Sequence, residues 1–243
     1  MTAAPAVAGR RLRPAVGLAI VLLVLIGVNV ATHVVHAFAL WVGPLLAVAL
    51  VLFARRAGLN WSQLGLSRRH LWSGVKWGLL AVAVVGAVYV VGILVPLTRV
   101  AFLDSRYHLA VSGALFTAFV VIPVGTVVFE EVAFRSVLWG LLSRHVATWR
   151  VMVISSLLFG LWHVLPSLHL ASANRGVGDA LRSAGGMSAV LAVAGAVLVT
   201  TIGGLIAGEL RRRSGSVLAS AAMHWATNSL GVLFGLVAWQ LAG

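Results

Sequence analysis

The chain has 243 residues, of which 61% are hydrophobic and 9% are charged, and its mean hydropathy is +1.05. Soluble domains carry roughly 25% charged residues, so this composition excludes a water-soluble globular protein. The long apolar stretches indicate an all-α, polytopic membrane helix bundle. The chain contains no Cys, which excludes disulfides, thiolate metal sites and a Cys nucleophile.

The formal net charge is +13, from 18 basic and 5 acidic residues. Such an excess also occurs in nucleic-acid-binding proteins. Here the Arg residues form short clusters between apolar segments, which is the pattern of membrane orientation, so no nucleic-acid partner is expected. Carboxylate chemistry must draw on five residues, namely Asp104, Glu130, Glu131, Asp179 and Glu209.

The N-terminal residues 1–13 are rich in Ala, Pro and Arg and are predicted to be disordered and basic. The apolar run that begins at Pro14 is too long for the core of a typical signal peptide, so it is interpreted as a retained transmembrane helix. Apolar windows of about 20 residues predict about seven spans: 14–31, 36–54, 76–97, 110–133, 150–166, 187–208 and 216–240.

The sequence also predicts how the fourth and last spans end and how the chain is divided. Residues 134–149 extend the fourth span as an amphipathic helix, and an eighth span results if the last one is broken at Gly231. The Ser-, Gly- and Asn-rich loop 167–186 is interpreted as a linker, with a lid as the alternative. We expect residues 14–56 to form an N-terminal two-span hairpin and residues 57–243 to form the functional core.

The distribution of charge predicts the orientation. With the N-terminus in the cytoplasm, fourteen basic residues lie on the cytoplasmic side and four on the other. This is a strong positive-inside bias, and one span more or fewer would mix the two sets. The four outer residues are Arg99, Arg106, Arg175 and Arg182.

Two adjacent carboxylates, Glu130 and Glu131, end the long apolar run of the fourth span. On a helix Glu131 and Arg135 are four residues apart and can pair. Glu130 points about 100° away, so it faces a different surface and is free for chemistry. Ionisable residues inside a span are functional candidates, and here they are favoured over a salt-bridged helix end.

Two further polar positions lie on other spans. His163 follows Phe159 by one helical turn in the fifth span, and His224 and Asn228 share one face of the last span. A lone His or Asn in a span often only links helices, but together these residues form a set. The nine Trp are mostly interpreted as interfacial anchors.

A carboxylate, two imidazoles and a carboxamide are sufficient for peptide hydrolysis. The carboxylate acts as general base on water, one His orients the water or protonates the leaving amine, and the second His and the Asn donate to the oxyanion. Glu130, His163 and His224 could instead hold zinc. The His-Glu-x-x-His signature of common zinc proteases is absent from the sequence.

The ordered motifs Glu130-Glu131-x-x-x-Arg135, Phe159-x-x-x-His163 and His224-x-x-x-Asn228 resemble those of the type II CAAX prenyl endopeptidases, within the CPBP (Abi) intramembrane protease family. The resemblance covers roughly residues 60–240. It implies an all-helical intramembrane endopeptidase whose site lies in a cavity open to the cytoplasmic leaflet.

The resemblance also implies roles for these residues. Glu130 activates the water with the help of His163, and His224 and Asn228 stabilise the oxyanion. Glu131 and Arg135 hold the geometry of the site. The family is often labelled a metalloprotease, so zinc stays a candidate cofactor, although the glutamate mechanism requires none.

The expected substrate is a membrane-associated peptide or a membrane-tethered protein C-terminus. The Ala-, Val-, Arg- and Gly-rich composition indicates a bacterium of high GC content, hence a multi-pass protein of the bacterial plasma membrane and a substrate other than a prenylated CAAX protein. One alternative is a non-catalytic membrane immunity or interaction protein on the same scaffold. Another is a b-type haem protein with His163 and His224 as axial ligands. A proton-coupled transporter is disfavoured because no inverted repeat is visible.

Overall fold

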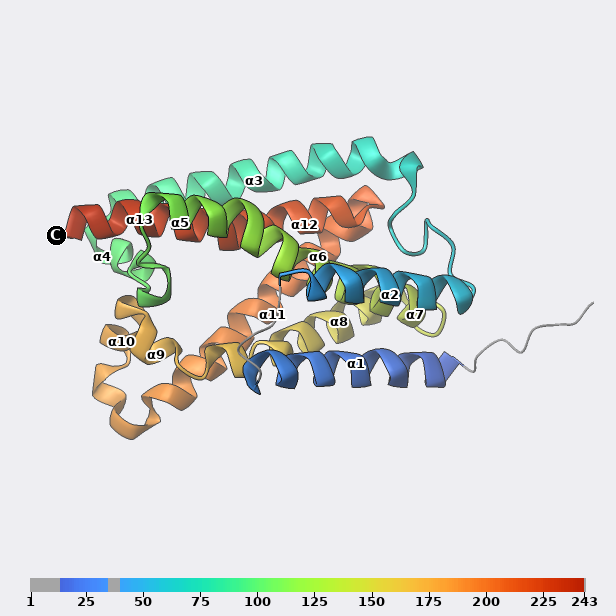
Figure 1. The fold of residues 1–243 in the computed structure, drawn as a ribbon, viewed down its shortest axis with the longest axis horizontal. Coiled ribbons are helices and arrows are strands. Elements are labelled where there is room, and N and C mark those ends of the chain that lie inside the picture. The colour runs from blue at the N-terminus through green and yellow to red at the C-terminus, as the bar shows by residue number, and fades with distance from the viewer. Residues whose placement is uncertain (1–13, 35–39, 243) are drawn as a thin grey trace, which may run out of the picture.

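The structure, a computed structural model, describes residues 14–34 and 40–242. The segment 1–13, predicted to be disordered, lies outside the described residues. The described residues form helices and contain no β-strand, so the predicted all-α class is confirmed. Figure 1 shows the long helices running back and forth along one common direction.

Successive long segments reverse direction and form the bundle (Figure 1). They are α1 (Pro14–Val34), α2 (Val42–Arg56), α3 (Leu71–Leu94), a continuous helix from α5 to α7 (Val111–Leu142), α8 (Thr148–Trp162), α11 (Ser188–Ser214), and a continuous helix from α12 to α13 (Val217–Ala242). Their order and places follow the predicted spans.

Length separates these segments into two groups. Five described helices are long and apolar enough to cross a membrane, or six if α8 and the segment after it, bent by 46°, count as one span. Residues 36–39 of the predicted span 36–54 lie outside the described residues, and the rest corresponds to α2, which has 15 residues, fewer than the roughly 20 that a bilayer requires. The count of seven spans and the cytoplasmic N-terminus therefore stay predictions.

The fourth span contains π-helical turns on both sides of the acidic pair. It consists of α5 (Val111–Phe116), η4 (Thr117–Val127), α6 (Val128–Glu131), η5 (Val132–Leu138) and α7 (Trp139–Leu142), with η4 and η5 in the π conformation. Pro123 lies inside η4 and cannot donate a backbone hydrogen bond. Such π turns are frequent at functional sites. The helix continues to Leu142, so the predicted extension 134–149 is found only over its first part; residues 133–142 are buried on all sides, and the predicted amphipathic character is wrong.

The last span also contains a π-helical segment between two α-helical ones. It consists of α12 (Val217–Trp225), the π-helical η8 (Ala226–Leu230) and α13 (Gly231–Ala242), which follow one another directly. The helix therefore passes through Gly231 without a break, and the optional eighth span is not found. The turn before it is set by Gly215, whose φ of +70° favours glycine, and by Ser216, whose hydroxyl accepts from the Leu218 amide.

Short helices form the connections. At one end of the bundle these are α4 (Pro96–Arg99), η2 (Val100–Phe102), η3 (Ser105–Tyr107), η6 (Leu165–Ser167), α9 (Leu170–Ala173), α10 (Arg175–Ala180) and η7 (Arg182–Met187); η1 (Arg68–His70) lies before α3. Asn174 forms an isolated β-bridge with Asp104, and its side chain donates to the Ala101 carbonyl over 2.8 Å. The loop 167–186 is thus packed against residues 100–107, and its interpretation as a plain linker is wrong.

Small residues allow the helices to approach closely. A Cβ atom on Gly160 of α8 would lie 2.8 Å from the Val197 carbonyl oxygen of α11, and one on Gly204 would lie 3.0 Å from the Ser156 Cβ. A Cβ on Gly43 of α2 would lie 2.8 Å from the Gly125 carbonyl oxygen. Such contacts are how helices associate in a lipid environment.

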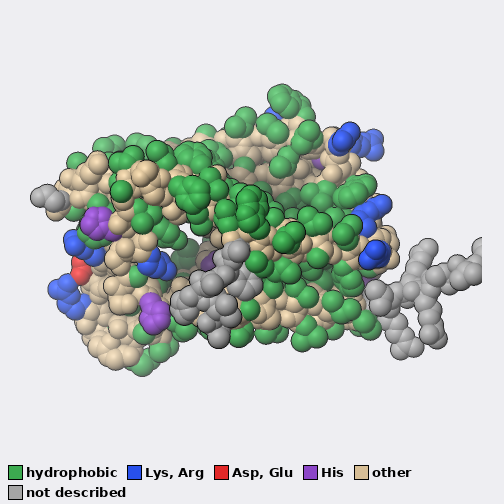
Figure 2. Space-filling model, viewed as in Figure 1, with side chains coloured by type: hydrophobic (Ala, Val, Ile, Leu, Met, Phe, Trp, Pro, Cys, Tyr) green, Lys and Arg blue, Asp and Glu red, His purple; other side chains and the backbone are tan. Residues whose placement is uncertain are grey.

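The surface of the bundle is apolar between two unequal ends. Figure 2 shows hydrophobic side chains over the middle of the molecule and basic ones toward its ends. We call the end where α2 and α11 finish the Arg-rich end; it lies at the right of Figure 1 and carries Arg55, Arg56, Arg68, Arg69, Lys76, Arg144, Arg150, Arg211, Arg212 and Arg213. The Arg-poor end carries Arg99, Arg106, Arg175 and Arg182.

Candidate active site

The acidic pair of α6 is divided between two environments. Both carboxylates are buried, with Glu130 at 7% and Glu131 at 1% relative exposure. Glu130 lines a cavity of about 1040 Å³, and its Oε1 accepts a hydrogen bond of 3.0 Å from the Trp162 indole. Its Oε2 has no hydrogen-bond partner among the described residues. One buried carboxylate oxygen is thus available to a ligand or to water.

Glu131 is held by two cationic or polar partners. Its Oε1 lies 3.2 Å from an Arg135 guanidinium nitrogen, which is the pairing expected from the spacing, and 3.0 Å from His224 Nδ1. Arg135 is 2% exposed, and its guanidinium lies 3.8 Å from the centre of the Phe159 ring. An uncompensated charge at this depth would be costly, so Glu131 and Arg135 stabilise each other and fix the position of His224.

His224 joins the two carboxylates. Its Nδ1 faces Glu131, and its Nε2 lies 3.7 Å from Glu130 Oε2. That distance is too long for a direct hydrogen bond, but two groups at this separation can both contact one water molecule. The π-helical turns of η5 and η8 on either side of these contacts change the helix phase, so the residues reach positions that a regular α-helix would not give them.

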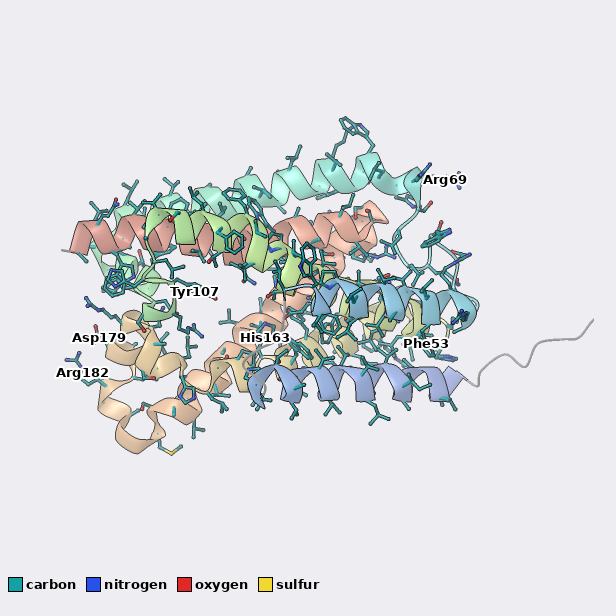
Figure 3. All side chains as sticks on the ribbon, viewed as in Figure 1. Phe53, Arg69, Tyr107, His163, Asp179 and Arg182 are labelled. Atoms are coloured by element: carbon teal, nitrogen blue, oxygen red, sulfur yellow. The ribbon has the colours of Figure 1, made fainter. Side chains whose placement is uncertain are left out.

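His163 approaches from α8. It is the first residue after the helix, and its Nδ1 lies 2.7 Å from the Phe159 carbonyl oxygen, so its Nε2 remains for the cavity. The Phe159 ring packs edge-on against both imidazoles, with centroid distances of 4.6 Å to His163 and 5.7 Å to His224. Figure 3 shows His163 near the middle of the molecule, away from both ends.

Two cavities meet around these residues. The larger, about 1040 Å³, contains Glu130, and the smaller, about 300 Å³, contains Glu131, Arg135 and His224. His163 and Asn228 line both. Glu130 and His224 thus line two neighbouring cavities that share His163 and Asn228 in their walls, and these four residues come from the fourth span, the end of α8 and the last span.

Two residues of this site were not anticipated. Trp162 had been grouped with the interfacial Trp, yet its indole donates to Glu130. Its position directly before His163 was the available signal. Asn29 of α1 is 8% exposed and donates to the Trp162 carbonyl over 2.7 Å, so the first helix contacts the residue that hydrogen-bonds to Glu130. A single Asn within an apolar span was the signal for this residue.

The residues do not form a ready metal site. Among the described residues, no group of three His, Asp or Glu side chains is arranged to hold a metal ion. Glu130 and His224 are close, but His163, the third zinc ligand that the sequence suggested, does not complete a cluster with them. The zinc ligand set therefore does not fit this geometry, and no chemical step is assigned to a metal.

Comparison with known proteins identifies the central part of the chain. Residues 112–230 match the family model described as type II CAAX prenyl endopeptidase Rce1-like. This part of the chain belongs to that family. The resemblance drawn from the three motifs is therefore confirmed. No curated protein and no solved structure matches the chain in the corresponding comparisons.

The Rce1-like segment runs from α5 to η8. It contains every residue of the three motifs, whereas Asn29 lies outside it. The match implies a protease that acts on a peptide or protein substrate in the membrane, and together with the apolar helices of the described residues it indicates a multi-pass membrane protein.

Proposed function

We propose that the protein is an intramembrane endopeptidase in which Glu130 is the general base. The observation that carries the proposal is the pair of facts that Glu130 lines the large cavity and that its buried Oε2 lacks a hydrogen-bond partner among the described residues and lies 3.7 Å from His224 Nε2. A water molecule beside this oxygen would lose a proton to Glu130 as it attacks a peptide carbonyl. His163, on the wall of the same cavity, would orient the water or protonate the leaving amine.

The oxyanion would be stabilised by His224 and Asn228. The Nδ1 of His224 contacts Glu131 Oε1 at 3.0 Å, whereas its Nε2 lies 3.7 Å from Glu130 Oε2, too far for a direct hydrogen bond, so the Nε2 position is left to a ligand. Its Nε2–H would turn to the developing oxyanion together with the Asn228 carboxamide, which is exposed to the cavity. Glu131 and Arg135 act through His224, so we propose them as positioning residues.

The substrate we propose is a membrane-associated peptide or a membrane-tethered protein C-terminus. Its setting is the bacterial plasma membrane, where the protein crosses the bilayer several times. The cavity of about 1040 Å³ is large enough for a peptide segment, since pockets for small ligands measure roughly 300–1,000 Å³. The mechanism draws only on protein side chains, and metal analysis of the purified protein would decide whether zinc takes part.

The test is the substitution Glu130→Gln, assayed on a library of membrane-inserted peptides with product detection by mass spectrometry. We expect turnover to fall by roughly 10²–10⁴-fold, because a positioned general base contributes about that much. The fold should survive, since a Gln Oε1 still accepts from Trp162. Glu209→Gln is the matched control, because Glu209 pairs with Arg212 and Arg213 far from the cavity.

The same experiment separates the alternatives. An immunity or interaction protein would keep its partner when Glu130 is replaced, and unchanged turnover in Glu130→Gln would reject the general base. A haem protein needs a free nitrogen on each axial His. His224 has both of its nitrogens facing Glu130 and Glu131, which disfavours it as a haem ligand.

A further inference from the structure

The large cavity runs from Glu130 to the Arg-poor end of the molecule. Deep inside, it is lined by Phe129 and Glu130, and at its other extreme by residues that precede α5 or follow α8. These outer residues are Ala101, Phe102, Asp104, Arg106, Tyr107 and Asn174. Figure 3 shows Tyr107 on the side of His163 that lies away from Arg69, and Figure 2 shows the molecule hollowed in this region.

The route from the site to the Arg-rich end is closed. None of the residues that line either cavity belongs to 55–76, 143–150 or 209–216. Between the site and that end lie fully buried side chains of the fourth span, such as Val137 and Leu138, covered by Leu59 and Leu64 of the α2–α3 connection.

At this end, two arginines hydrogen-bond to carbonyl groups of the α2–α3 connection and hold it against the bundle. Arg211 is 5% exposed and donates to the Arg135 carbonyl over 3.1 Å and to the Gln63 carbonyl over 3.1 Å. Arg144 donates to the Ala57 carbonyl over 2.9 Å and also to the Gly58 carbonyl. The α2–α3 connection is thereby held over the inner end of the site, and neither of the two cavities extends through it among the described residues.

The closed end is also the strongly basic one. The Arg-rich end holds ten described basic side chains and one acidic side chain, Glu209. The Arg-poor end holds four Arg and two Asp, and Asp104 and Asp179 pair with Arg106 and Arg182 there. Basic residues in short loops stay on the cytoplasmic side, so the open mouth of the cavity faces away from the cytoplasm.

We propose that the active site receives its substrate from the extracytoplasmic side of the membrane. This inference rests on the proposed function, and it narrows the substrate class to a peptide or protein segment displayed on the outer side. It differs from the cytoplasmic opening that the family resemblance implies. The apolar walls, formed by residues such as Leu40, Phe116 and Val121, suit an apolar segment, and the polar mouth suits its soluble flank.

The absence of Cys from the sequence allows a direct test. Single-Cys variants Thr126→Cys, one helical turn before Glu130, and Thr32→Cys, on the cavity wall of α1, report on the cavity. Ser62→Cys, exposed at the Arg-rich end, is the matched control. Each variant is treated with a small membrane-impermeant thiol reagent in right-side-out and in inside-out membrane vesicles.

We expect the two cavity variants to be labelled in right-side-out vesicles and Ser62→Cys only in inside-out vesicles, each with at least a tenfold preference. Labelling of the cavity variants from the same side as Ser62→Cys, or from neither side, overturns the proposal. Labelling reports the opening of the cavity whether or not the protein hydrolyses peptides. A failed proposed function would instead appear as unchanged turnover in Glu130→Gln, with the labelling pattern intact.

Discussion

Adjacent residues in this chain have separate tasks because the helix turns their side chains into different surroundings. Glu130 meets the Trp162 indole and an open cavity, whereas Glu131 meets Arg135 and His224. The spacing of Glu131 and Arg135 was enough to predict their pairing. The contact of Trp162 with Glu130 was not predictable, because a pattern of spans does not define the rotation of one helix against another.

At the residue scale, Asn29 offers a test of how the site is positioned. Its carboxamide donates to the carbonyl of Trp162, and the Trp162 indole in turn donates to Glu130. In Asn29→Leu the carbonyl loses this donor, which costs about 0.5–1.5 kcal/mol for a neutral hydrogen bond. We expect kcat to fall roughly two- to tenfold with little change in KM, because the general base is displaced while the cavity that binds the substrate is kept.

The control for Asn29 lies one turn along the same helix. Thr32 also lines the cavity, but its hydroxyl bonds only within α1, at the Asn29 carbonyl and the His33 ring. Thr32→Val should therefore keep the kcat and the KM of the unmodified protein. If Asn29→Leu behaved in the same way, α1 would have no part in positioning the site.

At the element scale, long apolar helices were predictable from hydropathy, while their inner geometry was not. The places of α1, α3 and α11 follow from apolar runs that only a helix can carry across a bilayer. The π turns of η4, η5 and η8 do not follow from hydropathy, which registers only that a segment is apolar. The loop 167–186 is polar, as linkers are, but Asn174 ties it to Asp104, which is a tertiary contact without a local signature.

The segment formed by η2 and η3 gives a prediction of pH dependence. Burial alone would raise the pKa of the Asp104 carboxyl group, but hydrogen bonds and the charge of Arg106 outweigh burial and hold that pKa below its usual value. A lowered pKa means that the ionised form stabilises the folded segment. This stabilisation is complete above the ordinary carboxyl pKa of about 4 and is lost as the pH falls through the lowered value.

Hydrogen exchange of residues 100–107 measures this effect locally. At pH 7 we expect Asp104→Asn to show less protection than the unmodified protein, by roughly 0.5–1 kcal/mol, a modest value because the partner Arg106 side chain is 42% exposed. As the pH falls through the lowered pKa of Asp104, the two proteins should converge. Equal protection at pH 7 would mean that the Asp104 carboxylate does not stabilise the mouth of the cavity.

At the scale of the whole molecule, the family match covers less of the chain than the site uses. The Rce1-like segment begins at residue 112, and the division into a 14–56 hairpin and a 57–243 core is a prediction from the sequence. The buried cluster around the fourth span, however, contains Val21 and Leu25 of α1 and Leu50 and Ala54 of α2. The motifs could be found from the sequence because they are local, whereas this dependence on the first two helices could not.

We therefore expect the chain 57–243 to lack activity when it is produced alone. Removal of α1 and α2 takes away the packing partners of Phe134 and Val137 and the Asn29 contact to Trp162, so the fourth span and the end of α8 lose their support. Turnover should drop at least tenfold, and co-production of residues 1–56 as a separate fragment should restore it, because packing between helices needs no covalent link. The same peptide assay measures both, with the amount of protein in the membrane as the reference. Full turnover by 57–243 alone would show instead that the N-terminal hairpin is dispensable for the site.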